Sequence, residues 1–319
     1  MIVLFLSFFL DFFSFTAKRL LFSFYICYYR PEVKKMKKLF ILTLTLIFAG
    51  ILALQTACSD GGNKNSASER KSSSENPVSS STVPETSSDD LSEADLWDVS
   101  DVDISHIAEN SRLIAFTFDD GPTDKTDALL DVFESFNEKN SDFIARATLF
   151  TIGSKISREY SQVLERAVSM KFELGNHTFT HTDLTTLTDE KIIEELSETD
   201  KALKTFDGKE IHLVRPAGGH ADNRVLSTYR STFINWTTSL DTSDWENSVT
   251  ENDIYDTVSK NLCEGGIVLM HQGCDKTINA VKRLLPDLKA RGFQVVSVSE
   301  LIKFYDIKAE IGKLYDNFI

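Results

Sequence analysis

Hydrophobic and polar residues alternate in two different patterns between residue 111 and residue 305. Short apolar runs predict strands, and apolar residues spaced three and four positions apart predict helices. The predicted strands are 112–118, 147–152, 172–174, 211–215, 233–239, 266–271 and 293–298. The predicted helices are 125–139, 157–170, 188–206, 252–262 and 277–290. Repeated strand–helix units predict an α/β fold with a mostly parallel sheet, either open or closed into a barrel.

Residues 36–58 have the pattern of a secretory signal, MKKLFILTLTLIFAGILALQTAC, with a basic start and an uncharged apolar run. Small residues precede Cys58, and this arrangement resembles a bacterial lipoprotein site at which Cys58 would be lipidated. Leu54 lies one position too far upstream for that motif, and Gln55 fills the usual leucine position. A plain cleaved signal peptide and an uncleaved membrane anchor are therefore the alternatives for residues 36–58.

The chain outside this segment divides into four further parts. Residues 1–35 are apolar and rich in phenylalanine, and are either an extra membrane segment or an upstream extension; we favour translation from Met36. Residues 59–104 are rich in Ser, Asp and Glu and predict a flexible linker. We expect one folded domain at 105–305 and a C-terminal tail at 306–319.

Charge and cysteine content narrow the class of protein. The net charge of −14 argues against nucleic-acid binding, which needs a basic face. Cys263 and Cys274 flank an apolar run that predicts a strand, which would hold them roughly 20 Å apart at ~3.3 Å per residue. A disulfide needs Cα atoms within ~7 Å, so we expect none here, even in an extracytoplasmic domain.

Polar side chains follow five of the predicted strands at their carboxyl ends. They are Asp119 and Asp120, His177, Arg215, Asp241 and Asp244, and His271. In a parallel barrel these ends converge on one face, where such folds build active sites. The pair His177 and His181 has a spacing of four, which would place both imidazoles on one face of a helical turn, as in metal sites. Two unrelated surface histidines remain the alternative.

Five short motifs occur in one order. They are TFDDGP at 117–122, HTFTH at 177–181, RPAGG at 215–219, DTSDW at 241–245 and LMH at 269–271. With these motifs the chain resembles the polysaccharide deacetylases of carbohydrate esterase family four over residues 110–305. The resemblance implies a distorted (β/α) barrel of about seven parallel strands. It also implies a divalent metal, usually zinc and sometimes cobalt or nickel, bound by Asp120, His177 and His181.

The same resemblance assigns the catalytic roles. Asp119 would be the general base that activates water, and His271 the general acid that protonates the leaving amine. Arg215 would pair with Asp119 and keep it ionised, and Asp244 would orient the supporting charges. Two residues, Trp245 and Leu269, would line the acetyl pocket.

The third motif departs from the common family pattern. Many relatives have a proline and an aromatic residue where this chain has Ala217 and Gly218. The Gly218 N–H can still stabilise an oxyanion, but the missing ring is expected to leave the groove more open. The histidines outside the motifs (His106, His212 and His220) and Trp236 are expected to have structural or surface positions.

The expected activity is metal-dependent removal of N-acetyl groups from an acetylated extracellular glycan. A secreted or lipid-anchored bacterial domain favours N-acetylglucosamine of peptidoglycan as the substrate. Chitooligosaccharides and acetylxylan are possible substrates within the same family. The sequence also leaves open a catalytically inactive glycan-binding relative and a hydrolase of non-sugar amides. Metal content and acetate release distinguish these possibilities.

Overall fold

The computed structural model describes residues 92–319. The predicted upstream extension, the signal segment with Cys58 and most of the linker lie outside the described residues. Within residues 92–319, no helix is long and apolar enough to cross a membrane.

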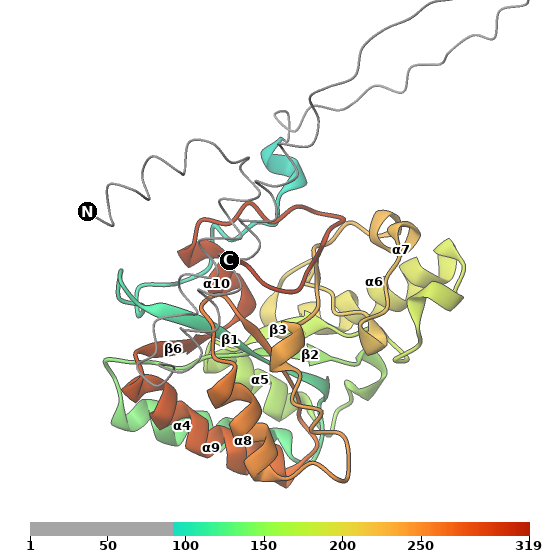
Figure 1. Cartoon of the computed structure of the whole chain (residues 1–319). Coiled ribbons are helices and arrows are strands. Elements are labelled where there is room, and N and C mark those ends of the chain that lie inside the picture. Colours follow the sequence, from blue (N-terminus) through green and yellow to red (C-terminus); the bar gives the residue numbers. More distant parts are fainter. Residues whose placement is uncertain (1–91) are drawn as a thin grey trace, which may run out of the picture. The chain divides into compact units, whose positions relative to one another are not determined.

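A parallel sheet forms the centre of the domain (Figure 1). Its order is β3-β2-β1-β5, and β6 pairs with the first half of β1. The bounds are β1 Arg112–Gly121, β2 Thr148–Thr151, β3 Glu173–Asn176, β5 Ile267–His271 and β6 Phe293–Val296. All of these pairings are parallel, which confirms the predicted α/β class.

Single backbone contacts extend this sheet around a ring. Val214 bridges β3 to β4 (Phe233–Ile234), and the Thr237 N–H donates to the Ile267 carbonyl of β5 over 3.0 Å. The expected strand 211–215 is thus reduced to a bridge at Val214, and 233–239 to two residues. The result is an irregular, barrel-like arrangement with short strands on one side.

The predicted C-terminal tail is part of this fold. Residues 314–315 form β7 (Leu314–Tyr315), which pairs in parallel with β4. Ala309 and Phe318 are buried, so the packed domain continues beyond residue 305. Cys263 and Cys274 lie beyond opposite ends of β5, as expected.

Helices cover the outside of the sheet. The five predicted helices are found as α4 Thr126–Lys139, α5 Ser161–Ser169, α6 Asp189–Asp207, α8 Glu251–Lys260 and α9 Asp275–Ala290. Two helices were not predicted, α7 Asn223–Thr228 and α10 Val298–Phe304. Short 3-10 turns occur as η1 Glu93–Asp95, η2 Gly153–Lys155, η3 Leu184–Thr186, η4 Ala217–Gly219 and η5 Thr238–Leu240. In Figure 1, α4, α9 and α8 lie next to one another on the outer face.

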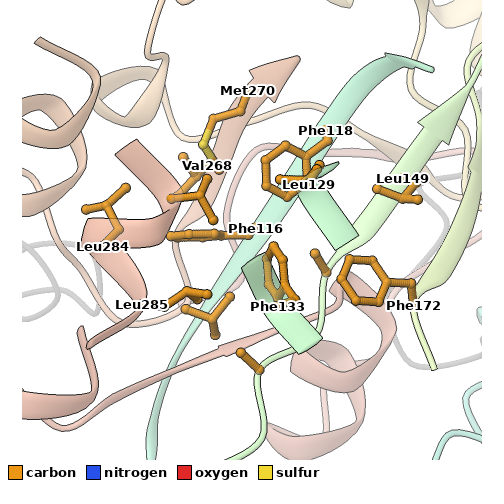
Figure 2. Packing of buried hydrophobic residues seen from close by; sticks show 14 of the residues in the cluster. Phe116, Phe118, Leu129, Phe133, Leu149, Phe172, Val268, Met270, Leu284 and Leu285 are labelled. Atoms are coloured by element: carbon orange, nitrogen blue, oxygen red, sulfur yellow. The ribbon is translucent and has the colours of Figure 1, made fainter. Parts of the chain in front are cut away.

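The alternation of side chains along β1 determines what faces the site. Phe116 and Phe118 pack outward against the helices (Figure 2), and Ile114 belongs to the same buried cluster. The rings of Phe118 and Phe133 meet edge to face at 6.1 Å between centroids. Each such buried side chain contributes about 1.5–3 kcal/mol by leaving water. The intervening residues of β1, including Thr117 and Asp119, therefore project into the ring.

Candidate active site

Two neighbouring carboxylates at the end of β1 point in different directions. Asp119 continues the strand and is 3% exposed. Asp120 has a left-handed backbone with φ of 66°, and the register of β1 with β2 shifts between Phe118 and Gly121. This irregularity breaks the alternation, as a bulge does. Asp120 is consequently half-exposed and faces the two histidines of the HTFTH segment.

Asp120, His177 and His181 form the one cluster of possible metal ligands found in the described part of the chain. Their ligand atoms lie within 4.8 Å of one another. Asp120 Oδ1 is 3.4 Å from His177 Nε2 and 3.2 Å from His181 Nε2. Asp120 Oδ1 is also buried and has no hydrogen-bond partner. Coordination to a bound cation would satisfy this oxygen. Two imidazoles and one carboxylate are the donor set of catalytic zinc sites, so these residues fit the metal.

The HTFTH segment is not helical, which corrects the expectation from the sequence spacing. It follows β3 as an irregular turn in which Thr178 and His181 have φ values of 64° and 61°. The turn nevertheless brings the imidazole centroids of His177 and His181 to 4.9 Å from each other.

The two histidines differ in how they are held. His177 Nδ1 lies 2.7 Å from the Arg215 carbonyl, so Nδ1–H donates there and Nε2 is left for a metal. His181 is partly exposed, and its backbone N–H donates to Thr178 Oγ1 at 3.0 Å. Burial and the neighbouring His177 lower the pKa of His181, which favours the neutral, ligating imidazole.

Arg215 is fully buried and anchors Asp119. Its Nη1 donates to Asp119 Oδ1 and to Thr117 Oγ1, both at 2.7 Å. The guanidinium also lies 4.1 Å above the centroid of the Phe150 ring. Burial lowers the pKa of Arg215, but an arginine stays protonated in proteins. The ion pair with Arg215 holds Asp119 in one orientation. The second carboxylate oxygen of Asp119, Oδ2, lies 3.8 Å from His177 Nε2.

His271 and Asp244 form a second polar pair on the adjacent strand. His271 Nδ1 is 2.6 Å from Asp244 Oδ1, and the His271 backbone N–H donates to Oδ2 at 2.9 Å. Thr277 Oγ1 also donates to that carboxylate at 2.5 Å. Burial lowers the pKa of His271, but the hydrogen bond to Asp244 and the charge of Asp119 outweigh it and raise the pKa to about 9. His271 is therefore protonated at neutral pH.

Strand register places the possible base next to the possible acid. Asp119 of β1 is the direct register partner of His271 of β5. Adjacent strands are about 4.8 Å apart, so both groups can reach one substrate bond. The sequence motifs thus converge at the carboxyl ends of β1, β3 and β5.

The remaining motif residues lie around this centre. Leu269 is buried in β5, and its carbonyl accepts a hydrogen bond from Thr242 Oγ1 at 2.8 Å. Trp245 is 63% exposed, so its indole lies at the protein surface. Asp241 accepts a hydrogen bond from the Ser243 N–H at 2.9 Å and organises the loop.

His220 lies beside Gly218 of the third motif. A Cβ atom built on Gly218 would lie only 3.4 Å from the His220 ring, so the imidazole occupies space beside the missing side chain. His220 Nδ1 lies 2.9 Å from Asp183 Oδ2, and this pair bridges the third motif to the segment after His181. In the sequence, the only indication that His220 lies near the site is its position directly after the third motif.

Comparison with known proteins identifies relatives of this chain. A family model described as polysaccharide deacetylase matches residues 106–235. The peptidoglycan-N-acetylglucosamine deacetylase of Bacillus cereus is 32% identical over 205 residues, or 62% of this chain and 92% of that protein. The bifunctional xylanase/deacetylase of Pseudobutyrivibrio xylanivorans is 30% identical over 66% of this chain, which spans only 34% of that larger protein.

A solved structure shows the same fold. The CE4 domain of a multidomain xylanase from the hindgut metagenome of Trinervitermes trinervoides aligns with a TM-score of 0.59 and 29% identity. The alignment covers 65% of this chain and 98% of that domain. The fold and the site therefore define a deacetylase, a class of hydrolase. The chain belongs to the polysaccharide deacetylase family.

Proposed function

We propose that this protein is a metal-dependent deacetylase that removes N-acetyl groups from N-acetylglucosamine residues of peptidoglycan. The observation that carries the proposal is the juxtaposition of three ligand side chains with a buried Asp119–Arg215 pair and a His271–Asp244 pair. Amide hydrolysis needs a metal or oxyanion donors, a base and an acid, and these groups supply each of them.

Asp120, His177 and His181 would hold the metal, with zinc the preferred ion and cobalt or nickel possible substitutes. When bound, such an ion polarises the acetyl carbonyl and lowers the pKa of water. Asp119, held by Arg215, takes the proton from the attacking water. The Gly218 N–H donates to the developing oxyanion, and His271 gives its proton to the leaving nitrogen.

The roles of the flanking residues follow from their positions. Asp244 keeps His271 protonated and fixes its orientation through two hydrogen bonds. Leu269 and Trp245 would line the acetyl pocket, because Leu269 lies in the strand that ends at His271 and Trp245 directly follows Asp244, which binds His271.

We further propose that the enzyme works outside the cytoplasm. A signal at 36–58 would export it, and a lipid on Cys58 or an uncleaved N-terminal segment would retain it at the membrane. The linker 59–104 would then give the catalytic domain reach into the cell wall. The Bacillus cereus relative that acts on peptidoglycan supports this choice of substrate.

Two further functions are distinguished by one screen. The xylanase/deacetylase relative supports acetylxylan as an alternative, and chitooligosaccharides share the same N-acetyl group. A non-catalytic glycan-binding relative would need none of the base, acid and ligand side chains that this chain retains. The test is acetate release by the metal-loaded full-length protein from peptidoglycan, chitooligosaccharides and acetylxylan.

We expect the fastest release from peptidoglycan. Faster release from acetylxylan or chitooligosaccharides would contradict the substrate. Glycan binding with no acetate from any of the three would contradict the enzymatic function.

A further inference from the structure

The turn that carries both histidine ligands has an unfavourable backbone. Thr178 and His181 both adopt left-handed φ values, 64° and 61°, although neither is a glycine. Each such residue costs about 1–3 kcal/mol and persists only where the surroundings hold it. The contacts that hold residues 177–181 therefore determine the metal geometry.

Helix α6 provides a carboxylate that binds the middle of this turn. Glu195 Oε2 accepts hydrogen bonds from the backbone N–H groups of Phe179 and Thr180 at 2.9 and 2.7 Å. Glu195 Oε1 accepts from Thr180 Oγ1 at 2.7 Å. One side chain thus receives three hydrogen bonds from two of the three residues between the ligands. Charge-assisted bonds of this kind are stronger than neutral ones.

Backbone groups of η2 hold the same turn through its carbonyls. Gly153 N–H donates to the Thr178 carbonyl at 2.9 Å, and Ser154 N–H to the Phe179 carbonyl at 2.8 Å. The carbonyls of the turn are thus bound by η2, and its central N–H groups by Glu195. Of these two supports, only Glu195 is a side chain, so it can be changed by substitution.

The two ligands depend on this support to different extents. His177 is fixed outside the turn, because its ring bonds the Arg215 carbonyl and its N–H bonds the Thr151 carbonyl. The His181 side chain is 41% exposed, and its backbone N–H is bound to Thr178 within the turn. A relaxed turn would therefore displace His181 more than His177.

We propose that Glu195 is a positioning residue that sets the metal geometry by holding the left-handed turn and, through it, His181. The proposal rests on the metal-dependent function proposed above. Groups that orient metal ligands typically change metal affinity by about 10–100-fold when they are removed. Glu195 lies outside the five sequence motifs and acts on the ligands through the backbone of the turn.

The test compares three variants of the metal-free full-length protein. Glu195→Ala removes all three hydrogen bonds, and Glu195→Gln keeps an oxygen that can accept from both backbone N–H groups. Glu198→Ala is the matched control, because Glu198 lies on the same helix in an exposed ion pair with Lys201. The readouts are the Kd for Zn²⁺ by calorimetry and the visible absorption spectrum with Co²⁺. Far-UV circular dichroism verifies folding.

We expect Glu195→Ala to raise the Kd about 10–100-fold and to alter the Co²⁺ spectrum. Glu195→Gln should recover most of the affinity, and Glu198→Ala should match the wild type. If folded Glu195→Ala bound Zn²⁺ and Co²⁺ as the wild type does, the positioning role would be overturned. A wild-type protein that bound metal but released no acetate would instead contradict the proposed function and leave this result intact.

Discussion

Asp119 and Asp120 are adjacent in sequence but have different surroundings. Regular alternation sends Asp119 into the ring, where Arg215 neutralises it. The left-handed backbone at Asp120 turns the second carboxylate toward the histidines. Two like charges are tolerated at adjacent positions because each faces its own positive partner, Arg215 for Asp119 and the proposed metal for Asp120.

The proposed acid role of His271 predicts a specific pH dependence. Its pKa is raised to about 9, so the protonated acid is present below that pH and is lost above it. A nearby cation lowers the pKa of an imidazole, so kcat/KM should fall along an alkaline limb at or below about pH 9. Asp244→Asn removes the charge that favours protonation and should move this limb to lower pH.

The matched measurement is the pH profile of acetate release for the wild type and Asp244→Asn. His271→Ala should lower kcat by about 10²–10⁴-fold, as expected for loss of a general acid. A limb at the same pH in both proteins would show that another group controls it.

Sequence motifs identify the residues at the strand ends better than the residues that support them. The clustering of Asp120, His177 and His181 could be predicted because each of the two motifs that contain them lies at the carboxyl end of a predicted strand. Glu195 and the His220–Asp183 pair could not, because their partners are 15 and 37 positions away and depend on packing. The helical turn expected at 177–181 was wrong because fourfold spacing alone does not exclude an irregular turn.

At the level of secondary-structure elements, α6 connects the turn at 177–181 to the rest of the domain. Its Asp200 is buried and accepts from Asn176 Nδ2 at 2.8 Å, while its other oxygen accepts from Tyr229 at 2.6 Å. His212 Nδ1 lies 2.9 Å from Asp200, and Nε2 lies 3.2 Å from Asp207. This buried network attaches the C-terminal half of α6 to the sheet and to the segment before β4.

The network predicts a loss of stability at alkaline pH. Burial lowers the pKa of His212, but hydrogen bonds to Asp200 and Asp207 outweigh it and raise the pKa to about 9. Because the folded pKa exceeds the unfolded one, the stabilisation is complete below about pH 6.5 and is lost as pH rises through about 9. The loss should be on the order of 3 kcal/mol at most.

Urea unfolding of the wild type and His212→Asn at about pH 6 and about pH 10 tests this. The wild type should lose more free energy of unfolding between the two values than the variant, since only the wild type can release this proton. Equal losses would contradict the charged state of His212.

Elements with strong periodicity were predicted well, and short ones were not. All five predicted helices are present, because their apolar faces pack on the sheet. The strand expected at 211–215 is reduced to a single bridge residue, because within this range only Val214 pairs with both neighbours, Asn176 and Phe233. Helix α10 starts with a Ser297–Glu300 capping box, a signal that the preceding apolar run 293–298 obscured. Strand β7 has two half-buried residues and a partner about 80 positions away, which leaves no local signal.

At the scale of the whole molecule, the sheet collects the chemistry from separate parts of the chain. The proposed base and one proposed ligand come from β1, two proposed ligands from the turn after β3, and the proposed acid from β5. The C-terminal residues complete the ring beside β4. Removal of residues 306–319 should therefore lower the melting temperature, because it removes the buried side chains of Ala309 and Phe318. An unchanged melting temperature would show that this segment is dispensable.

The two carboxylates that end β1 have two different proposed tasks in metal-dependent deacetylation. The decisive measurement determines bound zinc and acetate release together for full-length wild type, Asp119→Asn and Asp120→Asn. Asp119→Asn should retain zinc and lose about 10²–10⁴-fold in kcat, because only proton transfer is removed. Asp120→Asn should lose the zinc and, with it, the activity. Zinc loss in Asp119→Asn, or a near-normal rate in either variant, would contradict this division of tasks between Asp119 and Asp120.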